Sequence, residues 1–274
     1  MSNTNGYGTV PASNPEDGIG AGEGEHMPLL RKSDSRSLAV RTRHWMNVDV
    51  KREHADIILV LCYMVTGLLD SASISIWGSF VSMQTGNTVY IGLGLAAPRE
   101  STRWIKSSTS LGCFCLGSFV FSRLHRHFSP KRRWVLCTSF AAQMTFTIIA
   151  ASMVTFGPAV EDKDDISWNV LVPIALIAFQ SCGQAVTSRA LRYNSLNSVV
   201  LTSIYCDLFS DPNLFALDNA ERNRRVGAPI MLVVGAIIGG VFAHSSFGIA
   251  GALWTASALK LLAIVTWILW PQRE

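Results

Sequence analysis

The chain has few charged residues and no arrangement of residues that marks a common enzyme site. Only 15% of its 274 residues are charged. The sequence contains no H-E-x-x-H, no G-x-S-x-G and no phosphate-binding loop, and its histidines form no metal-site pattern. We therefore expect no enzyme activity, no catalytic residue, no cofactor and no bound metal. Most Lys and Arg lie outside the apolar runs, which indicates membrane topology and no nucleic-acid partner.

The six cysteines also lack the spacing of a redox or metal site. No C-x-x-C pair occurs, and all six lie in apolar runs or stretches. We expect them to be small apolar packing residues. The sequence shows no N-x-S/T glycosylation signal and no cleavable signal peptide at its start.

Long apolar runs dominate the rest of the chain. Six of them cover residues 55–77, 105–122, 134–156, 168–188, 226–244 and 248–270. Each is close to the roughly 20 residues that a membrane helix needs. Two shorter stretches, 88–98 and 196–209, are too short to cross a bilayer. The sequence therefore predicts an all-α integral membrane protein with six transmembrane helices and two short re-entrant half-helices.

The distribution of charges supports six crossings over eight. If residues 88–98 crossed the bilayer, the basic segment 123–133 would lie outside, against the positive-inside rule. If this stretch is re-entrant, segment 123–133, segment 210–225 and both termini are cytoplasmic, and the acidic loop 157–167 is outside. One disagreement with the rule remains, because Arg99, Arg103 and Lys106 then lie outside.

The first 54 residues differ in composition from the rest. They are polar and rich in Gly, Ser and Asn, which predicts a disordered cytoplasmic tail before a membrane domain at residues 55–270. Within the tail, Glu25 precedes the pair Leu29–Leu30 in the pattern of an acidic dileucine sorting signal. This pattern predicts an adaptor protein as a partner, and residence in the plasma membrane or in an endosomal or vacuolar membrane.

The membrane domain contains signs of an internal repeat, with halves at about 55–156 and 168–270. Gly67 precedes Thr85 by 18 residues, and Gly183 precedes Thr202 by 19. A G-x-x-x-x-G-x-F pattern follows each short stretch, at residues 112–119 and 235–242. Three crossings in each half would give the halves opposite orientations, as in many transporters. Gly235 and Gly239 also form G-x-x-x-G, which predicts close helix packing inside the bundle or in a homo-oligomer.

A polar break at residues 82–88 interrupts the first half. Polar backbone at membrane depth must be buried in protein or line a water-filled cavity. The break either caps the following half-helix to receive a polar or anionic solute, or serves only as a cap. Oppositely oriented halves would bring the two breaks together near the midplane. The predicted binding residues in the breaks are Thr85, Gly86, Asn87, Thr202 and Ser203.

Two further polar residues lie within the apolar runs themselves. Asp70 is costly to place in a membrane, which predicts that it faces the bundle interior. It could bind a proton or cation, form an ion pair with Arg189 or Arg192, or lie at the interface. Gln184 is a candidate solute-binding residue, although hydrogen bonding between helices explains it equally well.

The segment 67–71, with sequence GLLDS, and the segment 80–88, with sequence FVSMQTGNT, carry a family resemblance. They resemble the G-x-x-D and M-T-G-N elements of the YoaK-type family of uncharacterised membrane proteins, with Gln84 where that family has Met. The segment 200–208 resembles its T-V-x-T-G-x-x-x-D-L element, with Ser203 in place of Gly. The resemblance covers about residues 55–270, the tail is similar to that of fungal members, and it implies a multi-pass helical fold without implying an activity.

These observations favour a transporter or channel for a small solute or ion, with proton coupling through Asp70 as one form of it. The alternative is a membrane scaffold or accessory protein that transports nothing. An intramembrane enzyme is the third class and has the least support. A polar cavity joining Thr85, Asn87 and Asp70 would favour transport, whereas a solid bundle there would favour the scaffold.

Overall fold

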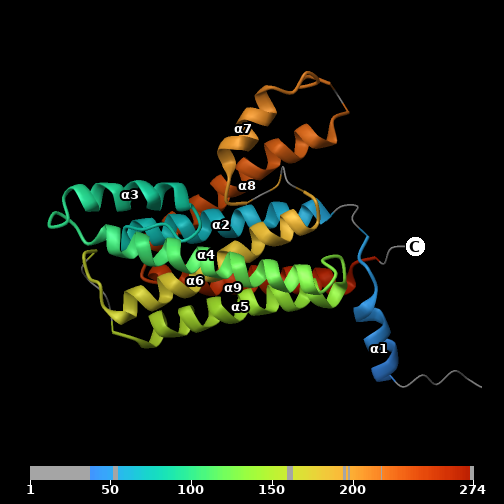
Figure 1. Cartoon of the computed structure of the whole chain (residues 1–274), viewed down its shortest axis with the longest axis horizontal. Coiled ribbons are helices and arrows are strands. Elements are labelled where there is room, and N and C mark those ends of the chain that lie inside the picture. The colour runs from blue at the N-terminus through green and yellow to red at the C-terminus, as the bar shows by residue number, and fades with distance from the viewer. Residues whose placement is uncertain are drawn as a thin grey trace, which may run out of the picture. The chain divides into compact units, whose positions relative to one another are not determined.

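A computed structural model describes residues 38–51, 55–158, 163–193, 196, 198–216 and 218–271. This part of the chain is helical, with one isolated backbone bridge between Asp49 and Arg132. The helices, coloured along the chain in Figure 1, are α1 (Leu38–Asn47), α2 (Ala55–Trp77), α3 (Gln84–Ala96), α4 (Arg103–His127), α5 (Arg133–Phe156), α6 (Trp168–Ala190), α7 (Leu201–Phe209), α8 (Ala220–Ala243) and α9 (Gly248–Leu269).

Five of these helices, α2, α5, α6, α8 and α9, are long and apolar enough to cross a membrane. The chain is therefore an integral membrane protein. The expected fold class is confirmed for an all-helical membrane protein. Helix α4 covers the predicted run 105–122 and is 25 residues long, but it is too polar to count among the five.

The bundle is built from helix pairs that lie far apart in the sequence. Helix α2 packs along α8, α4 along α6, and α5 along both α9 and α6. The α2–α8 contact is close because Gly67, Gly235 and Gly239 bring the two backbones together. A Cβ added at Gly235 would overlap the carbonyl oxygen of Met64. Gly235 and Gly239 therefore pack inside the bundle, which decides between the two uses that the sequence left open for them.

Replacing Gly235 with alanine should destabilise the protein, because the added methyl group has no room against α2. We expect a loss of about 1–3 kcal/mol in the free energy of unfolding, measured as a lower midpoint of thermal denaturation in detergent. Gly112 on α4 provides the matched control, since a Cβ there meets nothing within 4 Å. Gly112→Ala should be neutral or slightly stabilising. Equal effects of the two substitutions would contradict this packing.

At one end of the bundle, the loop that precedes α4 contacts the loop that precedes α6. The Thr102 hydroxyl donates to the backbone carbonyl of Asp164 at 2.7 Å. Hydrogen bonds from the Thr102 backbone amide and hydroxyl hold the pKa of Asp164 below its usual range. Lys106 is fully buried and donates to the carbonyl of Trp77 at 3.3 Å. The ammonium group of Lys106 is thus held inside the protein. This burial explains why Lys106, one of the three basic residues on the predicted outer side, need not follow the positive-inside rule.

At the opposite end, the start of α5 holds the chain before α2 against the end of α9. The fully buried Arg133 donates to the carbonyl oxygens of Trp45 and Trp270, both at 2.6 Å. Its guanidinium lies 3.9 Å from the centre of the Trp45 ring. Backbone hydrogen bonds join Val50 to Lys131 and join residue 51 to residue 271. Residues 38–51 belong to the predicted disordered tail, yet they contain helix α1 and make these contacts with the bundle. Residues 25–30, which carry the sorting motif, lie outside the described residues.

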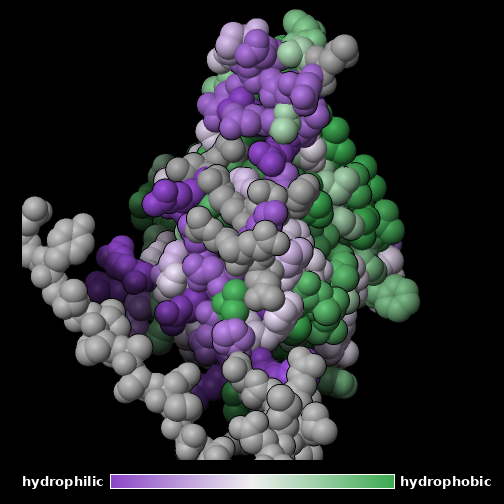
Figure 2. Space-filling model, turned by 90° about the vertical axis from the view of Figure 1, so that its right-hand side faces the viewer, coloured by the Kyte–Doolittle hydropathy of each residue, from purple (hydrophilic) through white to green (hydrophobic). Residues whose placement is uncertain are grey.

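The positive-inside rule predicts that this second end faces the cytoplasm. The segment before α2, the α4–α5 loop and the end of α9 meet there, as the predicted topology requires, and Figure 2 shows hydrophilic residues gathered on this face beside a hydrophobic flank. In a cysteine-free background, Ser129→Cys should therefore react with a membrane-impermeant thiol reagent only after the cells are opened. Ser101→Cys, at the other end, should react in intact cells. Labelling of residue 129 from outside would overturn this topology.

Candidate functional site

The first break lies between α2 and α3, where Gly78 takes a left-handed backbone conformation with φ of 74°. The buried carboxylate of Asp70 accepts hydrogen bonds from the backbone amides of Val81 at 2.8 Å and Ser82 at 2.9 Å. The Ser82 hydroxyl donates to the other carboxylate oxygen. From α6, the Ser181 hydroxyl donates to the Val81 carbonyl at 3.1 Å. The polar backbone of the break is thus buried in protein, as membrane depth requires.

Asn87 holds the start of α3 to this break and to α4. Its side chain is fully buried, and its amide nitrogen donates to Phe80 O at 2.8 Å, Gln84 Oε1 at 2.9 Å and Ser110 Oγ at 3.0 Å. Its amide oxygen accepts from the Phe80 backbone amide at 3.1 Å. Gly86 lies against the Phe80 ring, which a Cβ there would overlap. Both residues therefore shape the break and hold it in place.

Asp70 lies in the bundle interior with only 2% of its surface exposed. Within the described part of the chain, its partners are the loop groups of Val81 and Ser82, and no basic side chain forms an ion pair with it. Asp70 therefore does not form the ion pair with Arg189 or Arg192 that the sequence left open. Asp70 instead accepts hydrogen bonds from the non-helical segment between α2 and α3.

The second break lies between α6 and α7. The buried Ser188 hydroxyl lies 2.7 Å from the carbonyl oxygens of Tyr193 and Leu196, and so fixes the chain after α6. Thr202 and Ser203 are exposed on α7. The part of this segment that approaches the first break is the pair just before α7, Val199 and Val200. Thr85 lines a shared cavity with these valines, whereas Thr202 and Ser203, the residues expected to meet it, do not line that cavity.

That shared cavity has a volume of about 170 Å³ and lies between α3, α4, α6 and the start of α7. A second cavity of about 280 Å³ follows it along α4 and α6. Val186 and Arg189 line both, so we treat them as one feature, the α4–α6 crevice. Its narrow part is lined by Ser82, Gln84, Thr85, Phe114, Ser118, Cys182, Ala185, Val186, Arg189, Val199 and Val200, and its wide part by Ser122, His125, Arg126, Pro130, Val186, Arg189 and Ala190.

The crevice runs from the carboxyl-terminal end of α4 to the first break. Thr85 is exposed and lines it, whereas Asp70 and Asn87 lie behind its wall, bound to the loop. Gln184, the remaining candidate, is 2% exposed, and neither of its amide atoms has a hydrogen-bond partner within the described residues. The side-chain amide of the neighbouring Gln180 on α6 is also buried and has no hydrogen-bond partner within the described residues. Buried carboxamides of this kind are costly unless water or a ligand satisfies them.

The profile of a family described as a protein of unknown function (DUF1275) matches residues 58–266. The chain belongs to this family. The match confirms the resemblance found in the sequence, and it extends from the first turn of α2 to the last turn of α9. No curated protein and no solved structure matches the chain.

The DUF1275 domain also contains a buried lysine that the sequence analysis missed. Lys260 on α9 is 1% exposed, and its ammonium donates to Gln143 Oε1 of α5 at 2.9 Å. The Gln143 side chain fills the space left by Gly183 on α6. A lone lysine inside the run 248–270 was the signal that could have found it, because charges at membrane depth usually mark function or a specific partner.

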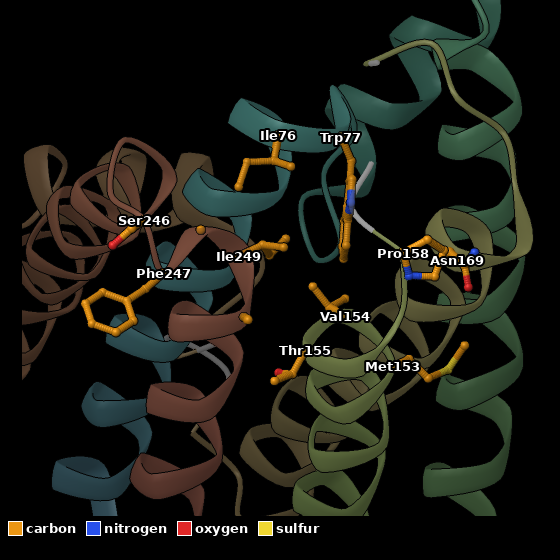
Figure 3. Close-up of a pocket in the computed structure, with 12 residues that line it drawn as sticks. Ile76, Trp77, Met153, Val154, Thr155, Pro158, Asn169, Ser246, Phe247 and Ile249 are labelled. Atoms are coloured by element: carbon orange, nitrogen blue, oxygen red, sulfur yellow. The ribbon is translucent and has the colours of Figure 1, made fainter. Parts of the chain in front are cut away.

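A larger cavity of about 510 Å³ opens at the opposite end of the DUF1275 domain, between the ends of α2 and α5 and the start of α9. Figure 3 shows Trp77, Val154 and Ile249 pointing into the same space. This cavity shares no lining residue with the α4–α6 crevice. Packed side chains such as Trp77, Val81 and Ile177 belong to one buried cluster in this half of the bundle.

Asp70→Ala should destabilise the DUF1275 domain, because it leaves the buried amides of Val81 and Ser82 without acceptors. Each unsatisfied group costs about 1–3 kcal/mol, so we expect a clear fall in the thermal midpoint in detergent. Asp70→Asn retains one acceptor oxygen and should cost less. The control is Asp207→Ala, which removes an exposed carboxylate from α7. Equal midpoints for Asp70→Ala and Asp207→Ala would show that Asp70 does not hold the break.

Proposed function

We propose that this protein is a transporter or channel for a small solute or ion, and neither an enzyme nor a passive scaffold. The observation that carries the proposal is the α4–α6 crevice, which leads from the cytoplasmic end to the place where both helix breaks meet. Broken helices that meet at a polar cavity inside a membrane bundle are the usual construction of a solute site.

The proposal includes an inverted repeat, and the pattern of helix contacts supports it. Exchanging α2 with α6, α3 with α7, α4 with α8 and α5 with α9 turns the α2–α8 contact into α6–α4. The same exchange turns α2–α9 into α6–α5 and α3–α4 into α7–α8, all of which are contacts in the bundle. Thr85 and Thr202 are each the second residue of their half-helix. Related halves of this kind allow alternating access around a central site.

The proposal also makes α4 the sixth crossing. Its 25 residues are long enough for the hydrocarbon core, at about 1.5 Å per residue. Its start lies beside Trp77 at the outer end, and its last turn lines the wide part of the crevice. Lys106, Ser107 and Ser110 are buried in the bundle. The residues left exposed for lipid include Leu116, Phe119 and Val120.

Proton coupling would act through the first break in this proposal. Protonating Asp70 would weaken its hydrogen bonds to the Val81 and Ser82 amides, because a neutral carboxyl is a poorer acceptor than a carboxylate. The break would then be freer to move against α6. The scaffold alternative draws its support from the tight α2–α8 contact and from the firm attachment of Asn87.

Thiol accessibility tests the crevice with a matched pair on α6. In a cysteine-free background, Ala185→Cys should react with a water-soluble, membrane-impermeant thiol reagent applied to the cytoplasmic face, since Ala185 lines the crevice. Ala178→Cys, two turns earlier on the same helix and fully buried, should not react. In proteoliposomes, the reagent should block any flux carried by the Ala185→Cys protein and leave the Ala178→Cys protein unaffected.

Failure of Ala185→Cys to react, with Ser118→Cys equally inert, would remove the water-filled crevice and favour the scaffold. Reaction at residue 185 without flux of any ion or metabolite in a broad proteoliposome screen would leave a binding protein in place of a transporter. Thiol reactivity thus tests whether the crevice holds water, and the flux measurement tests separately whether the protein transports a solute.

A further inference from the structure

Building on the proposed function, we infer that the α4–α6 crevice binds a small oxyanion, meaning a carboxylate or phosphate group, between Arg189, Arg126 and His125. The crevice itself is part of the proposed function. The inference adds the chemical class of its ligand, which neither the family match nor the helix packing supplies.

The charges that line the crevice have one sign. Its charged lining residues are Arg189, which lines both parts, and Arg126, which lines the wide part. No carboxylate is among the described lining residues of either part. A guanidinium offers planar pairs of N–H donors that match carboxylate and phosphate oxygens. A cation would meet two like charges here without a counter-charge on the walls.

His125 is an independent sign that the crevice receives a polar group. The ring is only 4% exposed and lines the wide part of the crevice. Its Nε2 lies 3.4 Å from the Thr187 hydroxyl. Its Nδ1 is buried and has no hydrogen-bond partner within the described part of the chain. The Thr187 hydroxyl already donates to the Gly183 carbonyl at 2.8 Å, so Nε2 is the ring donor and Nδ1 is an acceptor. A buried acceptor without a partner is costly, and a hydroxyl group of the ligand or a water bound to the ligand would satisfy it.

The inner end of the crevice adds positive potential from the backbone. Helix α3 begins at Gln84, and α7 begins at Leu201 directly after Val200. Gln84, Thr85 and Val200 line the narrow part, so the amino-terminal ends of both half-helices lie at its wall. The amino-terminal end of a helix carries a partial positive charge and favours anions.

The size of the crevice limits the ligand. Its two parts have volumes of about 170 and 280 Å³. Each volume is smaller than the roughly 300–1,000 Å³ of a site for a drug-sized ligand. Ser118 and Ser122 add hydroxyl groups along the α4 wall. A phosphate ion or a short carboxylate suits this space. Because the wide part lies at the cytoplasmic end of α4, the same chemistry could come from a soluble ion or from an anionic lipid headgroup.

The test uses the purified full-length protein in non-ionic detergent at low ionic strength, with potassium chloride as the background salt because chloride is not an oxyanion. Potassium phosphate, potassium sulfate and potassium acetate are titrated in turn, with choline chloride as the cation control. A ligand that binds only the folded state raises its thermal midpoint in a saturable way. At least one oxyanion should do so, and choline should not. Arg189→Gln should weaken the apparent affinity about tenfold or more.

Arg123→Gln is the matched control, because Arg123 is exposed on α4 over the Phe119 ring and does not line the crevice. It removes the same charge from the same end of the protein and should leave the affinity nearly unchanged. Arg189→Lys should retain part of the binding, and Arg126→Gln provides a second loss if Arg189→Gln fails to fold. An equal loss in Arg123→Gln would reduce the effect to the general positive field of the cytoplasmic face and overturn the site.

Nanodiscs distinguish the two sources of the oxyanion. If stabilisation depends on Arg189 and appears only in discs that contain phosphatidylserine, the ligand is a lipid headgroup; if soluble phosphate or acetate stabilises the protein in pure phosphatidylcholine discs, it is a free ion. Both outcomes support an oxyanion site. No saturable stabilisation in any arm overturns it, and a reactive Ala185→Cys in the same preparation would show that the crevice of the proposed function persists without it.

Discussion

The hydrogen bonds between Asp70 and the backbone of the first break decide how this chain can leave helical conformation inside a membrane. A bilayer offers no water to the amides of Val81 and Ser82, so they require acceptors within the protein. The carboxylate of Asp70 accepts from both at 2.8 and 2.9 Å, and Asn87 satisfies the groups of Phe80. Because these bonds satisfy the backbone of the break, α3 can begin inside the bundle. It then runs back to the end of the bundle at which α2 finishes and α4 begins.

The consequence of that anchored break is a polar wall along α4. The Ser110 hydroxyl accepts hydrogen bonds from the side-chain amides of Asn87 and Gln84. The buried polar residues of α4 thus lie on its side toward α3 and α6. An anchored half-helix therefore requires a polar partner helix, and the same polar side of α4 lines the crevice at Ser118 and Ser122. The residues of α4 that anchor the break and those that line the crevice thus occupy neighbouring parts of one helix surface.

The two ends of the bundle differ in how they are closed. At the end of the bundle where α4 finishes, Arg133 and Trp45 tie the segment before α2 to the end of α9, while the crevice opens beside α4 and α6. At the end where α2 finishes, the larger cavity stops at Trp77 and the packed cluster beneath it. The described part of the chain therefore has a cavity at each end, and the two cavities share no lining residue.

The sequence by itself determined the membrane class, the family and nearly every helix, because an apolar run of about 20 residues has few other uses. Predicted run 55–77 coincides with α2, and the other long runs agree with their helices to within a few residues except at the polar ends of α4 and α8. The sequence also predicted that Asp70 would face the interior, since its charge could not face lipid. It could not predict partners, because hydrophobic periodicity carries no information about which distant backbone a side chain reaches. Only the tertiary structure decided that Asp70 binds a loop, that Val199 and Val200 approach the first break in place of Thr202 and Ser203, and that Lys260 is paired with Gln143. Each of these depends on how helices far apart in the chain pack together, and that packing is set by the glycines and buried polar groups of several helices at once.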